Sequence, residues 1–364
     1  QIRSIEWGDF FKFYAHMATG FFRFYWAISI NLNLFFKLLT RWKYLYILQS
    51  FFKKYDVKIV LSGFEAPINQ VATALAADSI GMASFDCLWS IGERPNEFAC
   101  TQHRMSDRYF LWGMWHHDLM NASNDKSNGH IISGYVGDYN IPLMQSEGKK
   151  FRNKQLTKFN KIITVFDSGS AEDLLPKVIY RDFLKIILRT AEEFNALVIL
   201  KIKNEDRYSE FNQSIHTGRL IIHREKGSLE AALNSDVVIG IVNSGMTSVI
   251  AAHGKEVMFY DPNELVWSHW ETYVNACPIA RTLTDFEATL RGQLSNNISR
   301  AIPFAEHIDP YIDGKSQNRM GNYIQNVFDN LYQGKNMAIY LSDNIYKKQW
   351  GDDKVIIRKN LNIE

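Results

Sequence analysis

We expect an α/β protein of two domains, the second of them Rossmann-like, because three features of the sequence agree. Short apolar runs alternate with amphipathic stretches over residues 161–260, and a weaker alternation covers residues 57–142. The chain of 364 residues is also too long for one ordinary hydrophobic core. Strands and helices that alternate in this way form parallel sheets with right-handed crossovers.

The second half carries the clearer pattern. Its apolar runs predict strands at residues 161–168, 196–203, 219–225, 237–240 and 257–260. Between them, "LPKVIYRDFLKIILRTAEEFN" (175–195) has helical periodicity, and "SLEAALNS" (228–235) is a helix capped by Ser228. We place this second domain at residues 160–330.

The first domain, residues 1–150, has fewer clear elements. Strands are expected at 57–63, 82–90, 107–113 and at the start of 129–142, with a helix over 69–81. The lysine-rich stretch 146–161 is interpreted as an exposed connection that holds the domain boundary. Helices are also expected at 316–333 and 336–350, and residues 331–364 are assigned to a helical tail that packs back on the first domain.

Composition excludes several classes of function. A net charge of +2 gives little support for a nucleic-acid partner. The three cysteines (Cys87, Cys100 and Cys277) lack metal-ligand spacing and are expected to be buried apolar residues in a reducing compartment. His116 and His117 are adjacent, which suits metal binding on a helix poorly. We therefore expect no metal and no cofactor, and none of the common cofactor motifs occurs.

The first 55 residues are crowded with aromatic side chains. Their longest stretch without a charge is the thirteen residues from Phe24 to Phe36, and a bilayer span needs about 20. Two interpretations stay open. The segment is either a pair of core helices with solvated lysines, or an interfacial element whose aromatic and basic residues contact anionic lipid.

A turn of small and polar residues follows the strand at 237–240. Asn243, Ser244, Gly245, Met246, Thr247 and Ser248 stand before a helix of small residues. Ligands of open parallel sheets bind beyond the carboxyl ends of the strands, and a helix N-terminus attracts phosphate. The turn is therefore predicted to hold an anion at the surface rim; the alternative is a simple helix cap with a glycine turn.

Three more strands end in polar residues at the same predicted edge. The lysines among these residues are predicted to neutralise the charge of a diphosphate; the alternative is that they are ordinary solvated lysines. The residues are Asp167, Ser168 and Gly169 after the first strand, Lys201 and Lys203 at the second, and His223 and Arg224 at the third.

The second half resembles the GT-B-fold glycosyltransferase-like proteins of bacterial surface-carbohydrate (capsule and lipopolysaccharide) biosynthesis. The matching segments are "GHIISGYVGD" (129–138), "SDVVIGIVNSGMTSVIAAHGKEVMFYD" (235–261) and "DPYIDGKSQNRMGNYI" (309–324), with "YKKQWGDDKV" (346–355) near the end. The resemblance implies two Rossmann-like domains facing a cleft, with the nucleotide donor bound by the second. It also implies donor contacts at Ser244, Gly245, Thr247 and Ser248, near Lys201 and His223.

The sequence departs from these relatives at "KIKN" (201–204), where a Lys-Pro-His-Pro pattern is common. Their donor-phosphate histidine thus lacks a counterpart. An inverting transfer also needs a base near the acceptor hydroxyl, and a retaining transfer uses a carboxylate nucleophile or a different route. The first domain offers Glu65, Asp86 and Glu93, each expected after a strand at the cleft edge, where any of them could equally be a loop carboxylate or a cap.

These observations lead to a glycosyltransferase hypothesis. The protein is expected to move a sugar from a nucleotide-activated donor to a surface polysaccharide or a lipid-linked glycan acceptor. Cytoplasmic localisation, at the inner face of the cytoplasmic membrane, would suit that reaction. A polyol-phosphate transferase of the same fold and a non-catalytic glycan-assembly subunit are the alternatives.

Overall fold

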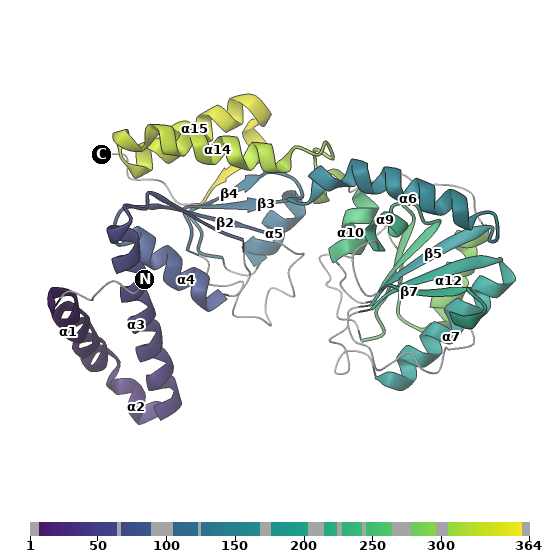
Figure 1. The fold of residues 1–364 in the computed structure, drawn as a ribbon, viewed down its shortest axis with the longest axis horizontal. Helices are drawn as coiled ribbons and strands as arrows, with labels where there is room; N and C mark the ends of the chain where they lie inside the picture. Colours follow the sequence, from purple (N-terminus) through teal and green to yellow (C-terminus); the bar gives the residue numbers. More distant parts are fainter. Residues whose placement is uncertain are drawn as a thin grey trace.

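The computed structural model describes residues 7–63, 67–88, 105–122, 125–167, 176–202, 215–223, 228–241, 245–263, 278–295 and 305–358. The chain forms two lobes, each built around one sheet, with a helical projection at the N-terminal end (Figure 1). Both lobes combine parallel strands with helices, as the sequence predicts.

The second lobe contains an entirely parallel six-stranded sheet in the order β10-β9-β8-β5-β6-β7. Counted from β5, this is the 3-2-1-4-5-6 order of a doubly wound Rossmann sheet. The strands are β5 (Lys161–Phe166), β6 (Ala196–Lys201), β7 (Leu220–His223), β8 (Val237–Ile241), β9 (Val257–Tyr260) and β10 (Ile279–Ala280). Their apolar runs are buried on both faces, which confirms the parallel sheet expected here.

Helices cover both faces of this sheet (Figure 1). They are α6 (Ile141–Gln155), α7 (Lys177–Glu193), α9 (Ser228–Ala232), α10 (Gly245–Ala252) and α12 (Leu283–Ser295). In α7, the buried Tyr180, Phe183, Leu184 and Ile187 recur at helical spacing and pack on β5 and β6. The short α13 (Ala305–Ile308) then leads the chain back to the first lobe.

Helix α6 replaces the exposed connection that we expected at 146–161. Its lysines lie on a solvent face, while Gly148 packs directly against the backbone of α9 at Glu230. Arg152 pairs with Asp236 at 2.9 Å and fixes the helix against the second sheet. Because only a narrow strip of α6 is apolar, its composition looked like that of a solvated linker.

The first lobe contains four parallel strands and one antiparallel strand, in the order β1-β2-β3-β4-β11. They are β1 (Ile59–Ser62), β2 (Ala83–Cys87), β3 (Arg108–Leu111), β4 (Gly129–Ile132) and β11 (Val355–Ile357). Strand β11 joins β4 at the edge, so the last described residues of the chain complete the first sheet.

Helices α4 (Pro67–Asp78) and α5 (Met114–Ala122) lie on one side of the first sheet, and α14 (Ser316–Asn330) and α15 (Lys335–Trp350) on the other (Figure 1). Met320, Tyr323 and Val327 of α14 share a core with Phe85 and Phe110 of the sheet. The C-terminal helices thus pack on the first lobe, as expected. This packing already begins at α14, which the sequence analysis had assigned to the second domain.

The projection consists of α1 (Trp7–Phe24), α2 (Trp26–Ile30) and α3 (Leu32–Lys54). Only the C-terminal part of α3 joins the first lobe, where Leu45, Leu48 and Phe52 pack against Ala76 and Ala77 of α4. The rest of the hairpin extends away from the lobe (Figure 1). Within the described residues, no helix has the length and apolar character required to cross a membrane.

A buried ion pair ties α15 to the first sheet. Arg108 of β3 and Asp343 of α15 are 0% and 1% exposed, and two guanidinium nitrogens donate to the two carboxylate oxygens. The Tyr323 hydroxyl of α14 donates to the same carboxylate at 2.7 Å. Because neither charge reaches water, each depends on the other for its solvation.

We therefore expect Asp343→Asn to lower the free energy of unfolding by about 3–5 kcal/mol, since it leaves the Arg108 guanidinium buried without a counter-charge. Urea denaturation measures the change. Asp352→Asn is the matched control, because the same chemical change at an exposed carboxylate should cost less than about 0.5 kcal/mol. Equal stabilities for the two variants would contradict a structural role for the pair.

Candidate functional site

The order of the second sheet defines where a ligand would bind. Strands β5 and β8 are neighbours, with Phe166 opposite Gly240, yet the chain continues from them toward opposite edges of the sheet. The connections therefore diverge beyond the carboxyl ends of β5 and β8. This position is called the switch point, and it is where open α/β sheets bind their ligands. Asp167 follows β5 there, and α10 begins four residues after β8 ends.

Helix α10 starts at Gly245, so the predicted turn does lead into a helix N-terminus. The hydroxyl groups of Thr247 and Ser248 do not lie on the rim, however. Thr247 and Ser248 are both 0% exposed, and neither hydroxyl has a hydrogen-bond partner among the residues that the structure describes. Met246 is half-buried. The first turn of α10 also presents backbone N–H groups that the helix itself leaves without partners.

Gly240 explains why α10 lies so close to β8. A Cβ atom at Gly240 would come within 2.6 Å of Thr247 Oγ1 and 3.0 Å of the Phe259 ring. Only glycine permits this contact between strand and helix. The close packing buries Thr247 and places the first turn of α10 beside the carboxyl end of β8.

Three of the other predicted edge residues, Asp167, Lys201 and His223, lie within the described part of the chain. Lys201 ends β6 beside Phe166, and His223 ends β7 beside Lys201. The Asp167 amide donates to the Lys201 carbonyl at 3.0 Å, which holds the ends of β5 and β6 together. Burial, followed by the charge of Lys201, lowers the pKa of His223, so its ring is neutral near pH 7 and acts as a hydrogen-bonding group.

The same edge holds an ion pair that the sequence analysis missed. Asp261 follows β9 and is fully buried, and Arg281 follows β10 and pairs with its carboxylate. Arg281 also donates to the Asp261 carbonyl at 3.2 Å. The sequence contained Asp261 at a strand end, but twenty residues separate it from the arginine.

Among the proposed catalytic carboxylates, Asp86 is the one within the described residues. It lies inside β2, one residue before the strand ends, and is 4% exposed. We had expected Asp86 to follow the strand, but it lies within the strand, near the carboxyl edge of the first sheet. The predicted residues that lie outside the described part of the chain are Glu65, Glu93, Ser168, Gly169, Lys203, Arg224, Asn243 and Ser244.

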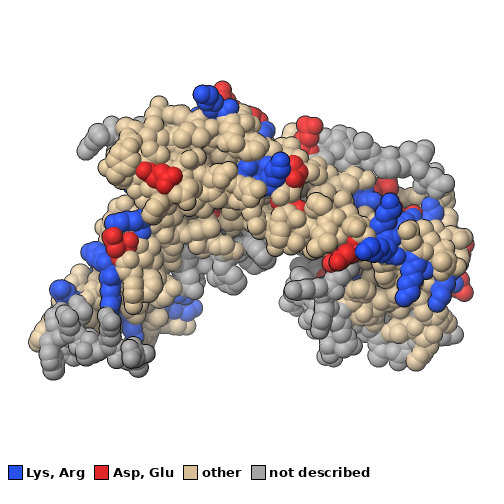
Figure 2. Space-filling model, turned by 45° about the horizontal axis from the view of Figure 1, so that its top comes forward, with Lys and Arg blue, Asp and Glu red and all other residues tan. Residues whose placement is uncertain are grey.

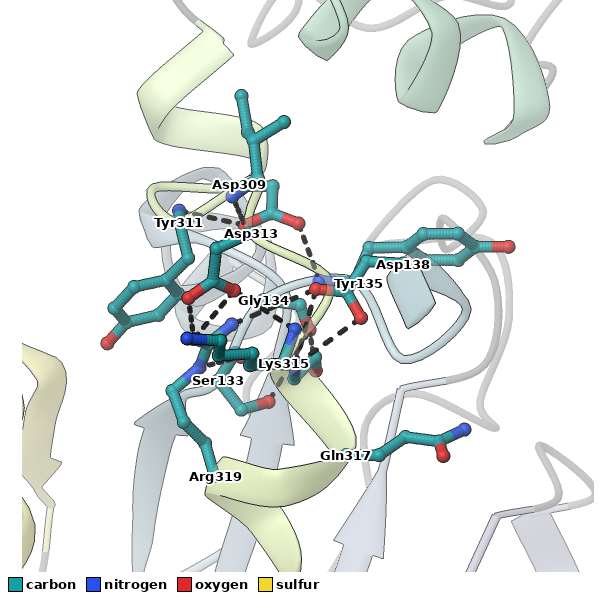
Figure 3. Close-up of polar contacts among 12 residues, drawn as sticks. Ser133, Gly134, Tyr135, Asp138, Asp309, Tyr311, Asp313, Lys315, Gln317 and Arg319 are labelled. Atoms are coloured by element: carbon teal, nitrogen blue, oxygen red, sulfur yellow. Dashed lines mark hydrogen bonds and ion pairs between the residues drawn. The ribbon is translucent and has the colours of Figure 1, made fainter. Parts of the chain in front are cut away.

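A second polar cluster lies where the chain crosses between the lobes (Figure 3). We call it the junction; it combines Ser133–Asp138, directly after β4, with Asp309–Arg319, which enters α14. Arg319 is 1% exposed and donates from Nε to the Ser133 carbonyl at 2.7 Å. Its Nη1 donates to both oxygens of Asp313 at 2.9 Å, and its guanidinium lies 3.7 Å from the centre of the Tyr311 ring.

Two further carboxylates complete the junction. Asp309 accepts from the backbone amides of Tyr135, Tyr311 and Ile312, which fixes both passing chains. Asp138 accepts from the Ser316 amide at 3.2 Å and lies 3.8 Å from Arg319 Nη2. Gly134 has φ +90°, and a Cβ atom there would meet the Arg319 guanidinium at 2.9 Å, so glycine is required.

The junction and the switch point contact one apolar core. Tyr135 and Tyr311 from the junction pack on the same cluster as Met246 from the first turn of α10. Trp112 and Trp115 of the first lobe belong to this cluster, together with Val249 of α10. The core is therefore continuous from one lobe to the other, directly behind both polar sites.

Comparison with solved structures reveals the fold. A Listeria monocytogenes structure assigned as a UDP-N-acetylglucosamine 2-epimerase matches with a TM-score of 0.58 at 13% identity, covering 80% of this chain and 79% of that one. The S. aureus MnaA–UDP structure matches with 0.57 at 14% identity (80% and 81%). The Neisseria meningitidis UDP-GlcNAc 2-epimerase bound to UDP-GlcNAc matches with 0.53 at 12% identity (79% and 81%).

This chain has the GT-B fold. The resemblance noted in the sequence is thereby confirmed at the level of fold. No protein-family model matches the chain, and no curated protein matches it in sequence. The segments "GHIISGYVGD" and "DPYIDGKSQNRMGNYI", on which the resemblance rested, meet at the junction; only their occurrence, not their contact, was visible in the sequence.

The junction should make stability depend on pH. Burial raises the pKa of Asp138 to about 6, above the 3.8 of an ordinary aspartate. The folded state therefore holds this proton more tightly than the unfolded state, and stability falls as the pH rises through this window. Asparagine does not titrate, so Asp138→Asn should not lose stability in this way. The free energy of unfolding of the variant, relative to that of the wild type, should therefore rise by up to about 3 kcal/mol between about pH 4 and pH 7.

Urea unfolding at several pH values measures this difference. Asp352→Asn serves again as the control, because no such gain is expected from an exposed aspartate. A constant offset between Asp138→Asn and the wild type across the range would show that Asp138 titrates normally.

Proposed function

We propose that this chain binds a nucleotide sugar at the switch point and transfers its sugar to a glycan or lipid-linked acceptor. The observation that carries the proposal is the combination of the 3-2-1-4-5-6 sheet with α10 beginning at its switch point. The fold agrees with it, since structural neighbours were solved with UDP or UDP-GlcNAc bound.

The chemistry of the edge supports a diphosphate ligand. The first turn of α10 presents unpaired N–H groups and the positive end of the helix dipole. Lys201 adds a charge, and the neutral His223 beside it adds a hydrogen-bond donor. Together they would stabilise the negative charge that develops on the leaving nucleotide during transfer.

The acceptor side is assigned to the first lobe. We propose Asp86, Glu65 or Glu93 as the carboxylate that acts on the acceptor hydroxyl or on the sugar. Asp86 is the candidate within the described residues, and it stands near the carboxyl end of β2, which points to the same side of the sheet as the carboxyl ends of β3 and β4.

A second candidate reaction is epimerisation of the nucleotide sugar. It is favoured by the structural neighbours that are named UDP-GlcNAc 2-epimerases. One experiment separates the reactions: the protein is incubated with UDP-sugars, with and without glycan acceptors. Release of UDP that requires an acceptor supports transfer, whereas a new UDP-sugar epimer formed without acceptor supports epimerisation.

Incubation with CDP-glycerol and calorimetry with free nucleotides test the remaining alternatives. Turnover of CDP-glycerol, but of no nucleotide sugar, would identify a polyol-phosphate transferase. Nucleotide binding in calorimetry without turnover of any donor would favour a non-catalytic assembly subunit. Absence of binding to UDP, CDP, GDP and CMP alike would overturn the proposed donor site.

Thr247→Val tests the contribution of the buried hydroxyl behind α10. Valine has the shape of threonine, and the lost hydroxyl has no hydrogen-bond partner among the described residues, so stability should change by less than about 1 kcal/mol. If the hydroxyl turns toward the donor phosphate, nucleotide affinity should fall about tenfold, because such a bond is worth about 1.5 kcal/mol or more.

Thr190→Val is the matched control. Thr190 lies in α7, is also fully buried, and its hydroxyl likewise has no partner within the described structure. Calorimetry should show unchanged nucleotide affinity for this variant. If both valine variants bind nucleotide like the wild type, Thr247 only fills space against Gly240, and the donor contacts are made by the backbone.

A further inference from the structure

The far end of the projection exposes apolar side chains that nothing in the described structure covers. We call residues 21–37 the tip; it comprises the end of α1, all of α2 and the start of α3. Phe22 is 78% exposed and Tyr25 63%, although both are large apolar residues. The other exposed apolar residues of the tip are Phe21, Trp26, Ile28, Leu32, Leu34 and Phe36.

Basic residues accompany this apolar surface, and acidic ones do not. Residues 10–55 contain no aspartate or glutamate, whereas seven lysines and arginines occur there. They are Lys12, Arg23, Lys37, Arg41, Lys43, Lys53 and Lys54, all of them exposed. Figure 2 shows blue side chains gathered on the projection at the lower left. A surface of this kind is complementary to a negatively charged one.

The projection is a packed hairpin and not two loosely associated helices. The Trp42 ring of α3 stacks on His16 of α1 at 4.5 Å, and its Nε1 donates to the His16 carbonyl at 2.8 Å. Gly20 lies directly against this ring, and a Cβ atom there would overlap it. Phe35 and Ala27 are buried between the helices. The hairpin therefore has a core of its own, and the exposed aromatic residues are those that do not take part in it.

We propose that the tip inserts into the interfacial region of an anionic lipid bilayer. Aromatic side chains partition into the boundary between headgroups and acyl chains, and basic residues behind them attract anionic headgroups. Arg23 and Lys37 stand at the two ends of the tip, and Arg41 and Lys43 follow one turn further along α3. Insertion buries the apolar residues without spanning the bilayer.

The position of the tip fits a membrane-facing enzyme. In Figure 2 the surface is hollowed between the two lobes, and the projection extends on the side toward which this hollow opens. Docking through the tip would therefore turn the hollow toward the bilayer. This orientation suits an acceptor whose lipid end stays in the membrane, although docking itself does not require the proposed reaction.

Co-sedimentation with vesicles tests the proposal on the full chain. The wild type should bind phosphatidylcholine vesicles that contain phosphatidylglycerol, and added salt should weaken the binding. The double variant Phe22→Ser/Trp26→Ser should bind at least tenfold more weakly, because it removes two exposed aromatic residues from the tip. Circular dichroism should confirm an unchanged fold, since both side chains face solvent.

A matched variant makes the test specific. Phe328 and Tyr332, beside the α14–α15 turn, are 54% and 83% exposed, and Phe328→Ser/Tyr332→Ser should bind vesicles like the wild type. Lys37→Glu/Arg41→Glu should abolish the preference for phosphatidylglycerol over phosphatidylcholine alone. Equal vesicle binding by all variants would overturn the proposal. The proposal would also be overturned if the wild type formed a dimer without lipid and Phe22→Ser/Trp26→Ser were monomeric. The tip would then be an interface between copies of the chain.

Discussion

A buried guanidinium at the crossing between the lobes is the contact on which the arrangement of this protein depends. Arg319 is almost inaccessible to solvent, and a cation in that position is costly unless its hydrogen bonds and charge are matched. Nη1 donates to both oxygens of Asp313, the Ser133 carbonyl accepts from Nε, and the Tyr311 ring covers the guanidinium face. Nη2 makes no hydrogen bond within the described residues but lies 3.8 Å from the Asp138 carboxylate. Each partner comes from a segment that passes between the lobes, so satisfying one side chain fixes both passages.

The position of the second lobe follows from that constraint. The outgoing chain leaves β4 at Ser133 and enters α6 within eight residues, while the returning chain runs from α13 into α14. Asp309 joins the two passages through the Tyr135 amide. Behind them, the apolar core that includes Trp115 and Val249 spans both lobes. The carboxyl edges of the two sheets are thereby held by a common support, which the two-substrate reaction we propose would require.

Local patterns predicted five of the six strands of the second sheet, because each of them is a continuous apolar run; β10 has only two residues and gave no such signal. The start of α10 near Gly245 was predictable from local patterns as well. Contacts between distant segments were not: nothing in "GYVGD" indicates that Asp138 will accept from Ser316, 178 residues later. Helix α6 was missed because only a narrow face, including Ile141 and Gly148, is buried. Strand β11 is three residues long and pairs antiparallel to β4, so it has no periodic signal of its own.

The small residues at the start of α10 also have a packing role, which their chemistry did not suggest. Hydroxyl groups before a helix look like ligand contacts, yet Thr247 and Ser248 lie inside the domain. Their size lets the helix approach β8, where Gly240 has no side chain to resist it. The approach places the N–H groups of the first turn beside the carboxyl end of β8, where the anion site we propose also includes Lys201 and His223. A run of small residues after a strand therefore predicts close packing between that strand and a helix N-terminus, because only small side chains allow the approach.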